Sequence, residues 1–318
     1  MIMLTGATGF VGGAVLTQLM QQSDLAIRTF GRRITVELSV NTSANVSHFI
    51  GNIDGATDYS MALDDIDVIV HCAALAHVAK GDELSYQQVN TFGTIKLAKQ
   101  ARQAGAKRFV FISSIGVNGP STKAIPFSVD STVHPHNAYA QSKYDAEVGL
   151  KKIAAETGLE VVIVRPTLVY GANAPGNFGL LTKLITKLPI LPFGLADNRR
   201  DFIAVQNLAD LLITCATHPD AAGHTFLASD GETVSIKEFT NAMAKGLNKK
   251  VLQLPIPVSL MQLAGKLTGK SAMIEQLFGN LAVDSSNIQQ VLGWTPPLTM
   301  QQAMACLRDS GKSSSGNE

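Results

Sequence analysis

The chain has few of the residues on which several common classes of protein depend. Its three cysteines, Cys72, Cys215 and Cys306, are widely spaced and odd in number, so they supply neither a disulfide framework nor a metal-ligand cluster. Lys and Arg number 26 against 25 Asp and Glu, which leaves no broad basic field for nucleic acid or an anionic membrane. We therefore expect no metal site, no nucleic-acid partner and no firm membrane association.

Targeting and membrane-spanning patterns are also missing from the sequence. Residues 1–4 lead directly into a glycine-rich turn, without the charged segment, apolar segment and cleavage site of a signal peptide. No apolar stretch reaches the roughly 18 residues that cross a bilayer without a charge or a helix breaker. Together with the dispersed cysteines, these features predict a cytoplasmic protein.

Hydrophobic residues make up 46% of the chain, and in its first half they form short runs between segments of helical length. Short, nearly all-apolar strands that alternate with helices are typical of a parallel sheet covered on both faces. The predicted strands are 1–4, 26–30, 47–50, 68–72, 109–113 and 161–164. Helices are predicted over 11–21 and over 86–105, the second closed by Gly105. The expected fold is α/β, with a Rossmann-type doubly wound parallel sheet.

The pattern changes after Arg165, where prolines and glycines interrupt the alternation. A helix over 205–216 and a strand over 225–228 restore it, and an apolar stretch with several prolines and glycines follows at 251–283. We interpret the leucine-rich part, 252–281, as core of a second lobe rather than as a surface for a membrane or a partner. The predicted organisation is a dinucleotide-binding domain (1–170, with 200–230 returning to it), a smaller, partly interleaved substrate lobe (171–308) and a disordered tail (309–318).

Glycines recur at every third position directly after the first predicted strand, in Thr5-Gly6-Ala7-Thr8-Gly9-Phe10-Val11-Gly12. The three glycines permit a tight turn, the close approach of a pyrophosphate and close packing of helix on sheet. The helix that follows presents free N–H groups and the positive end of its dipole to the phosphates. A glycine-rich turn without a ligand is the alternative, but the strand–turn–helix context favours a dinucleotide site. Its predicted residues are Gly6, Thr8, Gly9, Phe10, Val11 and Gly12.

This glycine spacing resembles that of the extended short-chain dehydrogenase/reductase family, in the NAD-dependent epimerase/dehydratase branch that acts on nucleotide sugars. The family carries a catalytic Tyr-x-x-x-Lys, which Tyr139 and Lys143 match. Side chains four residues apart lie on one face of a helix, where the ammonium is expected to lower the pKa of the phenol from about 10. Ser114, after the predicted strand 109–113, matches the family's serine or threonine that bonds the reacting oxygen. The resemblance implies that Ser114, Tyr139 and Lys143 are catalytic.

Three further segments extend the resemblance over residues 1–171. Residues 89–94 resemble the family's Asn-x-x-Gly-Thr segment, 67–74 resemble its fourth strand and the turn over the adenosine, and 165–171 resemble the segment that meets the nicotinamide. The cofactor contacts that the resemblance implies in these and neighbouring segments are Asn52, Ile53, Ala73, Ala74, Asn90 and Pro166.

A segment of the second lobe indicates the class of substrate. Residues 198–210 resemble the Arg-Asp-Phe/Tyr-Ile-x-Val-x-Asp-Leu-Ala segment of nucleotide-sugar epimerases, which puts Arg200 where the family has an arginine on the substrate's diphosphate. A guanidinium is the preferred bidentate partner of phosphate; the alternative is an arginine paired with Asp201. Residues 176–178 and 191–194 resemble the loops around the nucleotide base. The implied substrate contacts are Asn177, Phe178, Phe193 and Arg200.

Departures from the family pattern bear on cofactor and reaction. Where members that prefer NAD carry an acid for the ribose 2′-hydroxyl, this chain has Arg32 and Arg33. We expect them to hold the 2′-phosphate of NADP(H), with NAD possible if both point to solvent. Ile115 and Gly116 replace the acidic pair of the dehydratases, which argues against 4,6-dehydration. Leu168 replaces an asparagine that binds substrate in some 4-epimerases.

The sequence therefore predicts a nucleotide-sugar oxidoreductase that acts at C4 of a UDP-(N-acetyl)hexose by hydride transfer. Reduction of a 4-keto sugar by NADPH is favoured over 4-epimerisation with retained NAD. A reductase of another small carbonyl compound would have no need of Arg200. A non-catalytic, dinucleotide-sensing regulator would have no need of Ser114, Tyr139 and Lys143. We further expect a homodimer.

Overall fold

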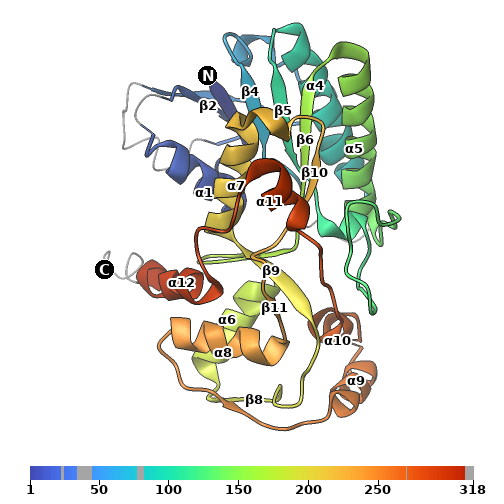
Figure 1. Ribbon diagram of the computed structural model, residues 1–318, viewed down its shortest axis with the longest axis vertical. Helices are drawn as coiled ribbons and strands as arrows, with labels where there is room; N and C mark the ends of the chain where they lie inside the picture. The colour runs from blue at the N-terminus through green and yellow to red at the C-terminus, as the bar shows by residue number, and fades with distance from the viewer. Residues whose placement is uncertain (23–24, 34–44, 77–81, 270, 312–318) are drawn as a thin grey trace.

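Seven parallel strands form the sheet of the larger lobe in this computed structural model, which describes residues 1–22, 25–33, 45–76, 82–269 and 271–311 (Figure 1). The strand order is β10-β6-β5-β4-β1-β2-β3. The strands are β1 (Ile2–Thr5), β2 (Ile27–Gly31), β3 (Val46–Ile50), β4 (Val68–His71), β5 (Arg108–Ile112), β6 (Glu160–Pro166) and β10 (Thr225–Ala228). The order reverses between β1 and β4, and ligands of such sheets bind at the carboxyl ends of the strands beside that point. The predicted Rossmann-type doubly wound sheet is confirmed.

Helices cover both faces of this sheet, so its strands are apolar on both sides. Ile2 and Leu4 face a core shared with α1 (Phe10–Leu19) and α7 (Val205–Thr217). Met3 faces the opposite core, shared with α4 (Thr94–Gln103) and α5 (Ala138–Thr157). Figure 1 shows the two helix layers on either side of the sheet. The alternation of side chains along one short strand thus supplies both cores.

The predicted helix over 86–105 consists of three joined pieces. It begins with α3 (Leu84–Tyr86), continues as a π-helical stretch, η2 (Gln87–Gly93), and ends with α4, after which Gly105 has a φ of +98°. A wider π-helical turn is uncommon and is found mostly near functional sites. It carries the buried Asn90 toward the carboxyl ends of the strands.

A smaller lobe lies at the carboxyl ends of the strands (Figure 1). Its three-stranded sheet has the order β11-β9-β7, and a two-stranded sheet pairs β12 with β8. Its core is aromatic, with the rings of Phe202 and Phe239 stacked 3.8 Å apart. The elements are β7 (Leu168–Tyr170), α6 (Asn177–Lys187), β8 (Ile190–Leu191), β9 (Arg200–Ala204), β11 (Thr233–Val234), α8 (Ile236–Gly246), β12 (Leu252–Gln253), α9 (Val258–Leu267), α10 (Ser271–Phe278) and α12 (Met300–Ala305).

The two lobes exchange chain segments. After β9 the chain returns to the larger lobe, where α7 packs against α1 and β10 pairs with β6. A second return brings α11 (Ser286–Leu292) into the larger lobe, because Ile288 and Leu292 belong to the core beside α7. Of the predicted tail, 309–311 continue the 3₁₀ turn η5 (Cys306–Gly311), and 312–318 lie outside the described residues.

Candidate active site

The glycine-rich turn between β1 and α1 is shaped by two close backbone approaches. Gly6 has a φ of +73°, and a Cβ atom there would lie 2.7 Å from the amide nitrogen of Ala73. At Gly12 a Cβ atom would lie 2.1 Å from the carbonyl oxygen of Gly6. Gly9 caps α1 without a side-chain hydrogen bond, so the first N–H groups of the helix remain open to a ligand. This cradle fits the pyrophosphate of a dinucleotide.

Asn90 fastens the turn after β4 instead of reaching toward a ligand. Its side chain is fully buried and donates to the carbonyl oxygen of Leu75 at 2.9 Å and to Ser142 Oγ at 3.1 Å. Its Oδ1 accepts from the amide of Leu75 at 2.8 Å. Both N–H groups of the amide are therefore used within the protein. These hydrogen bonds give Asn90 a positioning role, and the direct cofactor contact that the resemblance implies stays a prediction.

The other predicted cofactor residues lie at the ends of strands around the cradle. Ala73 and Ala74 follow β4, with Ala73 against Gly6, and Pro166 ends β6 in a buried position. Thr8 is exposed, Val11 is half-buried, and the half-buried Phe10 packs against the core of the smaller lobe. After β3, Asn52 is exposed, and Ile53 lies against Gly93, where a Cβ atom would be 2.9 Å from its Cγ2.

Arg32 and Arg33 follow β2 directly, and both side chains are exposed. Their place at the end of the second strand is the one that the family uses to distinguish the ribose hydroxyl from its phosphate. Gly31, Arg32 and Arg33 carry no carboxylate there. The geometry is open to either dinucleotide.

Ser114 lies two residues after the end of β5, and its hydroxyl is oriented by the 3₁₀ turn that follows, η3 (Ile115–Val117). Ser114 Oγ accepts a hydrogen bond from the amide of Gly116 at 3.1 Å. A Cβ atom at Gly116 would lie 3.2 Å from Ser114 Oγ, 3.0 Å from His136 Cε1 and 3.4 Å from Ala140 Cβ. Gly116 thus lets the serine approach the first turn of α5, beside Tyr139. A larger side chain at position 116 would require these neighbours to shift.

Tyr139 lies at the start of α5, where Asn137 caps the helix by accepting from the amide of Ala140 at 2.8 Å. Its ring meets that of Tyr86 edge-on, with 5.9 Å between the centroids. Burial, and secondarily the phenol of Tyr86, raise the pKa of Tyr139 to about 12. The expectation that Lys143 lowers this pKa is wrong for the protein groups alone, because desolvation penalises the phenolate.

Lys143 lies one helical turn further along α5 and is 2% exposed. Its ammonium donates to the carbonyl oxygen of Ile112 at 2.7 Å and lies 4.6 Å from the ring centroid of Phe111. Burial lowers the pKa of Lys143 to about 8. The ammonium is held at the end of β5, two residues before Ser114, and the turn at Gly116 brings Ser114 close to Ala140, which follows Tyr139 in the first turn of α5.

A buried ion pair behind the catalytic residues is not predicted from the sequence. The guanidinium of Arg165 donates to both carboxylate oxygens of Glu147, at 2.9 and 2.5 Å, and to Asn118 Oδ1 at 2.9 Å. Ser113 Oγ donates to Glu147 at 2.5 Å. The network joins the ends of β5 and β6 to α5. Its only sequence signal is the position of Glu147, four residues after Lys143.

Arg200 is the first residue of β9 in the smaller lobe and is 6% exposed. Its Nη1 donates to the carbonyl oxygen of Gly279 at 2.7 Å, and burial lowers its pKa to about 10. The neighbouring Asp201 accepts from Thr233 Oγ1 and from the amide of Val283 instead. Among the described residues Arg200 forms no ion pair, so the alternative of an Arg200–Asp201 salt bridge is not found.

The other predicted substrate residues make contacts within the smaller lobe. Phe178 and Phe193 are buried in its core, packed against Tyr170 and Phe278 respectively. Asn177 begins α6 and donates to Gln276 Oε1 at 2.8 Å, which ties α6 to α10. Sequence reasoning did not foresee that both rings support the lobe.

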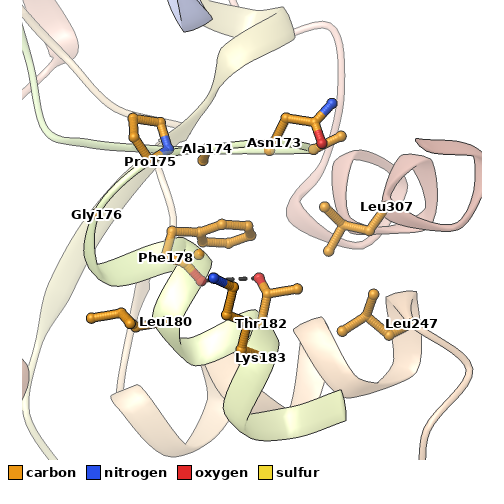
Figure 2. A pocket seen from close by; sticks show the side chains of 13 residues that line it. Asn173, Ala174, Pro175, Gly176, Phe178, Leu180, Thr182, Lys183, Leu247 and Leu307 are labelled. Atoms are coloured by element: carbon orange, nitrogen blue, oxygen red, sulfur yellow. Dashed lines mark hydrogen bonds between the residues drawn. The ribbon is translucent and has the colours of Figure 1, made fainter. Parts of the chain in front are cut away.

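A cavity of about 790 Å³ opens beside the loop 171–176 and the first turns of α6. Figure 2 shows Phe178, Thr182 and Lys183 on one side of it and Leu247 and Leu307 on the other. None of Ser114, Tyr139 and Lys143 lines it. The cavity is separate from the catalytic candidates.

The described residues contain no cluster of three or more His, Cys, Asp or Glu side chains that could hold a metal ion. Within the same part of the chain, none of the helices has the length and apolar character needed to cross a membrane.

Comparison with known proteins agrees with this geometry. The model of the NAD dependent epimerase/dehydratase family matches residues 2–229. The chain belongs to this family. Membership confirms the predicted enzyme of the extended short-chain dehydrogenase/reductase kind.

Similar proteins span nearly the whole chain. A UDP-glucose 4-epimerase of Vibrio cholerae is 42% identical over 307 residues, which cover 95% of this chain and 92% of that protein. An N-acetyl-alpha-D-glucosaminyl-diphospho-ditrans,octacis-undecaprenol 4-epimerase of Escherichia coli O157:H7 is 25% identical, with 95% and 92% covered. The structure of a UDP-glucuronic acid 4-epimerase from Bacillus cereus in complex with NAD superimposes with a TM-score of 0.79 at 21% identity, covering 100% and 98% of the two chains. At that identity the structural match supports the fold.

Proposed function

We propose that this protein is a UDP-hexose 4-epimerase that retains NAD through the reaction. The observation that carries the proposal is the 42% identity to the Vibrio cholerae UDP-glucose 4-epimerase over 95% of the chain. The proposal reverses the preference drawn from the sequence, which placed the NADPH-dependent reductase first. The gathering of Ser114, Tyr139 and Lys143 serves either reaction.

Each of the three residues has a separate task in this proposal. Tyr139, in the first turn of α5, takes the proton of the sugar's 4-hydroxyl and returns it. Ser114 Oγ, oriented by the amide of Gly116, bonds the same oxygen. Lys143 holds a buried ammonium at the end of β5, which would attract the negative charge that develops on the reacting oxygen. Hydride exchange with C4 is the chemistry that a nicotinamide held by the cradle between β1 and α1 would supply.

The diphosphate of the nucleotide is assigned to Arg200. Its guanidinium is buried and forms no ion pair among the described residues, and its one described acceptor is the backbone carbonyl of Gly279. The carboxylate of Asp201 acts on this cation only from beyond ion-pair distance. A buried cation without an acid in direct contact is costly unless an anionic ligand completes its environment. A pyrophosphate matches this requirement, and a small neutral carbonyl compound does not.

Reduction of a UDP-4-keto sugar by NADPH is the second candidate, favoured by one observation. Two exposed arginines follow β2, and no acid stands beside them for a ribose 2′-hydroxyl. An arginine at this place accommodates the 2′-phosphate of NADP.

Mass spectrometry of the ligands that remain bound to the purified protein distinguishes the two candidates. We expect one NAD per chain, because an epimerase that returns its hydride to the same sugar has no need to exchange its dinucleotide. Bound NADP, or a chain that retains no dinucleotide but binds NADPH from solution more tightly than NADH, would favour the reductase. The double variant Arg32→Ala/Arg33→Ala serves as the control. It should weaken the binding of NADPH relative to NADH and leave the rest of the site unchanged.

A further inference from the structure

The end of the smaller lobe that lies away from the seven-stranded sheet exposes apolar side chains beside lysines. In Figure 1, β8 and α9 form this end. We call it the distal surface. Its apolar members are Leu188, Ile190, Leu252, Leu254, Leu260, Leu263 and Leu267, exposed by 37 to 80%, and its basic members are Lys187, Lys249, Lys250 and Lys266, all exposed.

Helix α9 is apolar on two opposite sides. Val258 and Met261 pack against the core of the lobe, and Gly265 is buried behind them. Leu260, Leu263 and Leu267 follow the same spacing on the outer side, where they are 56, 53 and 80% exposed. A surface helix of a globular protein normally carries polar residues on that side. The outer leucines are therefore available to a partner outside the chain.

The two-stranded sheet at the same end of the lobe also exposes apolar side chains (Figure 1). Ile190 of β8 pairs with Leu252 of β12, and the two side chains are 46 and 60% exposed. Leu188 and Leu254, next to these strands, are 46 and 37% exposed. The stretch 252–281, predicted to be core, thus contributes a large part of its leucines to the surface. Exposed apolar side chains that gather in one place mark a contact with a partner or a membrane.

Positive charge is concentrated in the same part of the chain. Residues 239–274 contain five lysines, Lys245, Lys249, Lys250, Lys266 and Lys270, and no Asp or Glu, although the whole chain has a net charge of only +1. Three of these lysines, Lys245, Lys249 and Lys250, line one surface hollow together with Arg308. Two copies of the chain that met through this surface would bring lysines against lysines. The charge therefore favours an anionic partner.

We infer that the distal surface docks on the surface of an anionic phospholipid bilayer. The outer leucines of α9 and the apolar residues of β8 and β12 enter the boundary between headgroups and acyl chains, while the lysines face the anionic headgroups. With ten residues, α9 is too short to cross the bilayer and lies along it. The inference is independent of the proposed function, and it departs from the sequence-based expectation of no firm membrane association.

Sedimentation with lipid vesicles tests this docking in the purified full chain. The protein should sediment with vesicles of phosphatidylcholine and phosphatidylglycerol mixed about 2:1, less at high salt, and not with phosphatidylcholine alone. Leu263→Glu/Leu267→Glu should lower the partition coefficient at least about ten-fold, and Lys249→Gln/Lys250→Gln should lower it about ten-fold or more. Met61→Glu, which changes an 80% exposed apolar residue of the larger lobe, should leave it unchanged.

Several results would overturn the inference. The wild-type protein could fail to bind anionic vesicles, bind phosphatidylcholine equally, or lose as much binding through Met61→Glu as through the leucine variant. Enzyme activity and urea unfolding in vesicle-free buffer, both expected to be unchanged in these variants, separate lost docking from lost folding. If light scattering shows that the leucine variant turns a dimer into a monomer without any vesicle binding by the wild type, a second copy covers the surface and the inference fails.

Discussion

Replacing Lys143 by Met should stabilise the protein while removing its activity. Burial lowers the pKa of Lys143 from 10.5 to about 8, so the folded chain holds the proton less tightly than the unfolded chain. The charge therefore costs folding free energy at every pH below about 8, and the cost declines as the pH rises from 8 toward 10.5. Linkage puts it at about 3 kcal/mol at pH 7 and about 2 kcal/mol at pH 9.

Met has a similar length but cannot form the hydrogen bond to the carbonyl of Ile112. The lost hydrogen bond reduces the stabilisation gained from removing the charge by about 1 kcal/mol. Urea unfolding of protein freed of dinucleotide should show Lys143→Met more stable by about 2 kcal/mol at pH 7 and by about 1 kcal/mol at pH 9. The control is Lys152→Met on the same helix, whose lysine is 73% exposed and should matter by less than about 0.5 kcal/mol. Two results would refute the claim that the buried charge of Lys143 costs folding free energy. One is a Lys143→Met variant less stable than the wild type at pH 7, and the other is the same gain in unfolding free energy at pH 7 and pH 9.

Three further variants test other parts of the site. Glu147→Gln leaves the buried guanidinium of Arg165 without its acid and should lower the free energy of unfolding in urea by about 3–5 kcal/mol. A loss below about 1 kcal/mol would show that the ion pair does not stabilise the fold. Gly12→Ala puts a Cβ atom 2.1 Å from the Gly6 carbonyl oxygen, so absorbance should detect no bound dinucleotide in the purified variant. If the variant retains as much dinucleotide as the wild type, the glycine-rich turn is not the pyrophosphate site. Arg200→Ala should weaken UDP binding about 10- to 100-fold in titration calorimetry, whereas Arg199→Ala, which changes an exposed arginine, should leave it unchanged. If both variants weaken UDP binding equally, Arg200 does not bind the diphosphate.

The parts of the site that depend on local sequence were predictable. Gly6 and Gly12 are fixed by backbone distances that leave no space for a Cβ atom, so a spacing of three residues is enough to recognise the turn. Tyr139 and Lys143 are placed by the period of one helix. Their meeting with Ser114 follows from the order of parallel strands, because the ends of β5 and β6 and the start of α5 share one edge of the sheet.

Features that depend on tertiary contacts were not predictable. The Glu147–Arg165 pair joins residues 18 positions apart on two different elements, and no local pattern marks it. Asn90 carries the motif of a cofactor contact, yet its amide is used up by Leu75 and Ser142. In α9 the inner Val258 and Met261 and the outer leucines are equally apolar in the sequence. Apolar residues on both sides of a helix give no sign of which side is covered.

The direct test of the account is epimerisation without added cofactor. The purified protein is incubated with UDP-glucose alone, and UDP-galactose is followed by NMR spectroscopy. We expect the two sugars to reach the same equilibrium from either side, with Tyr139→Phe slowing the reaction by a factor of about 10²–10⁴ because the exchangeable proton is lost. No interconversion, together with mole-for-mole oxidation of NADPH by a UDP-4-keto sugar, would contradict the account, as would a Tyr139→Phe variant as fast as the wild type.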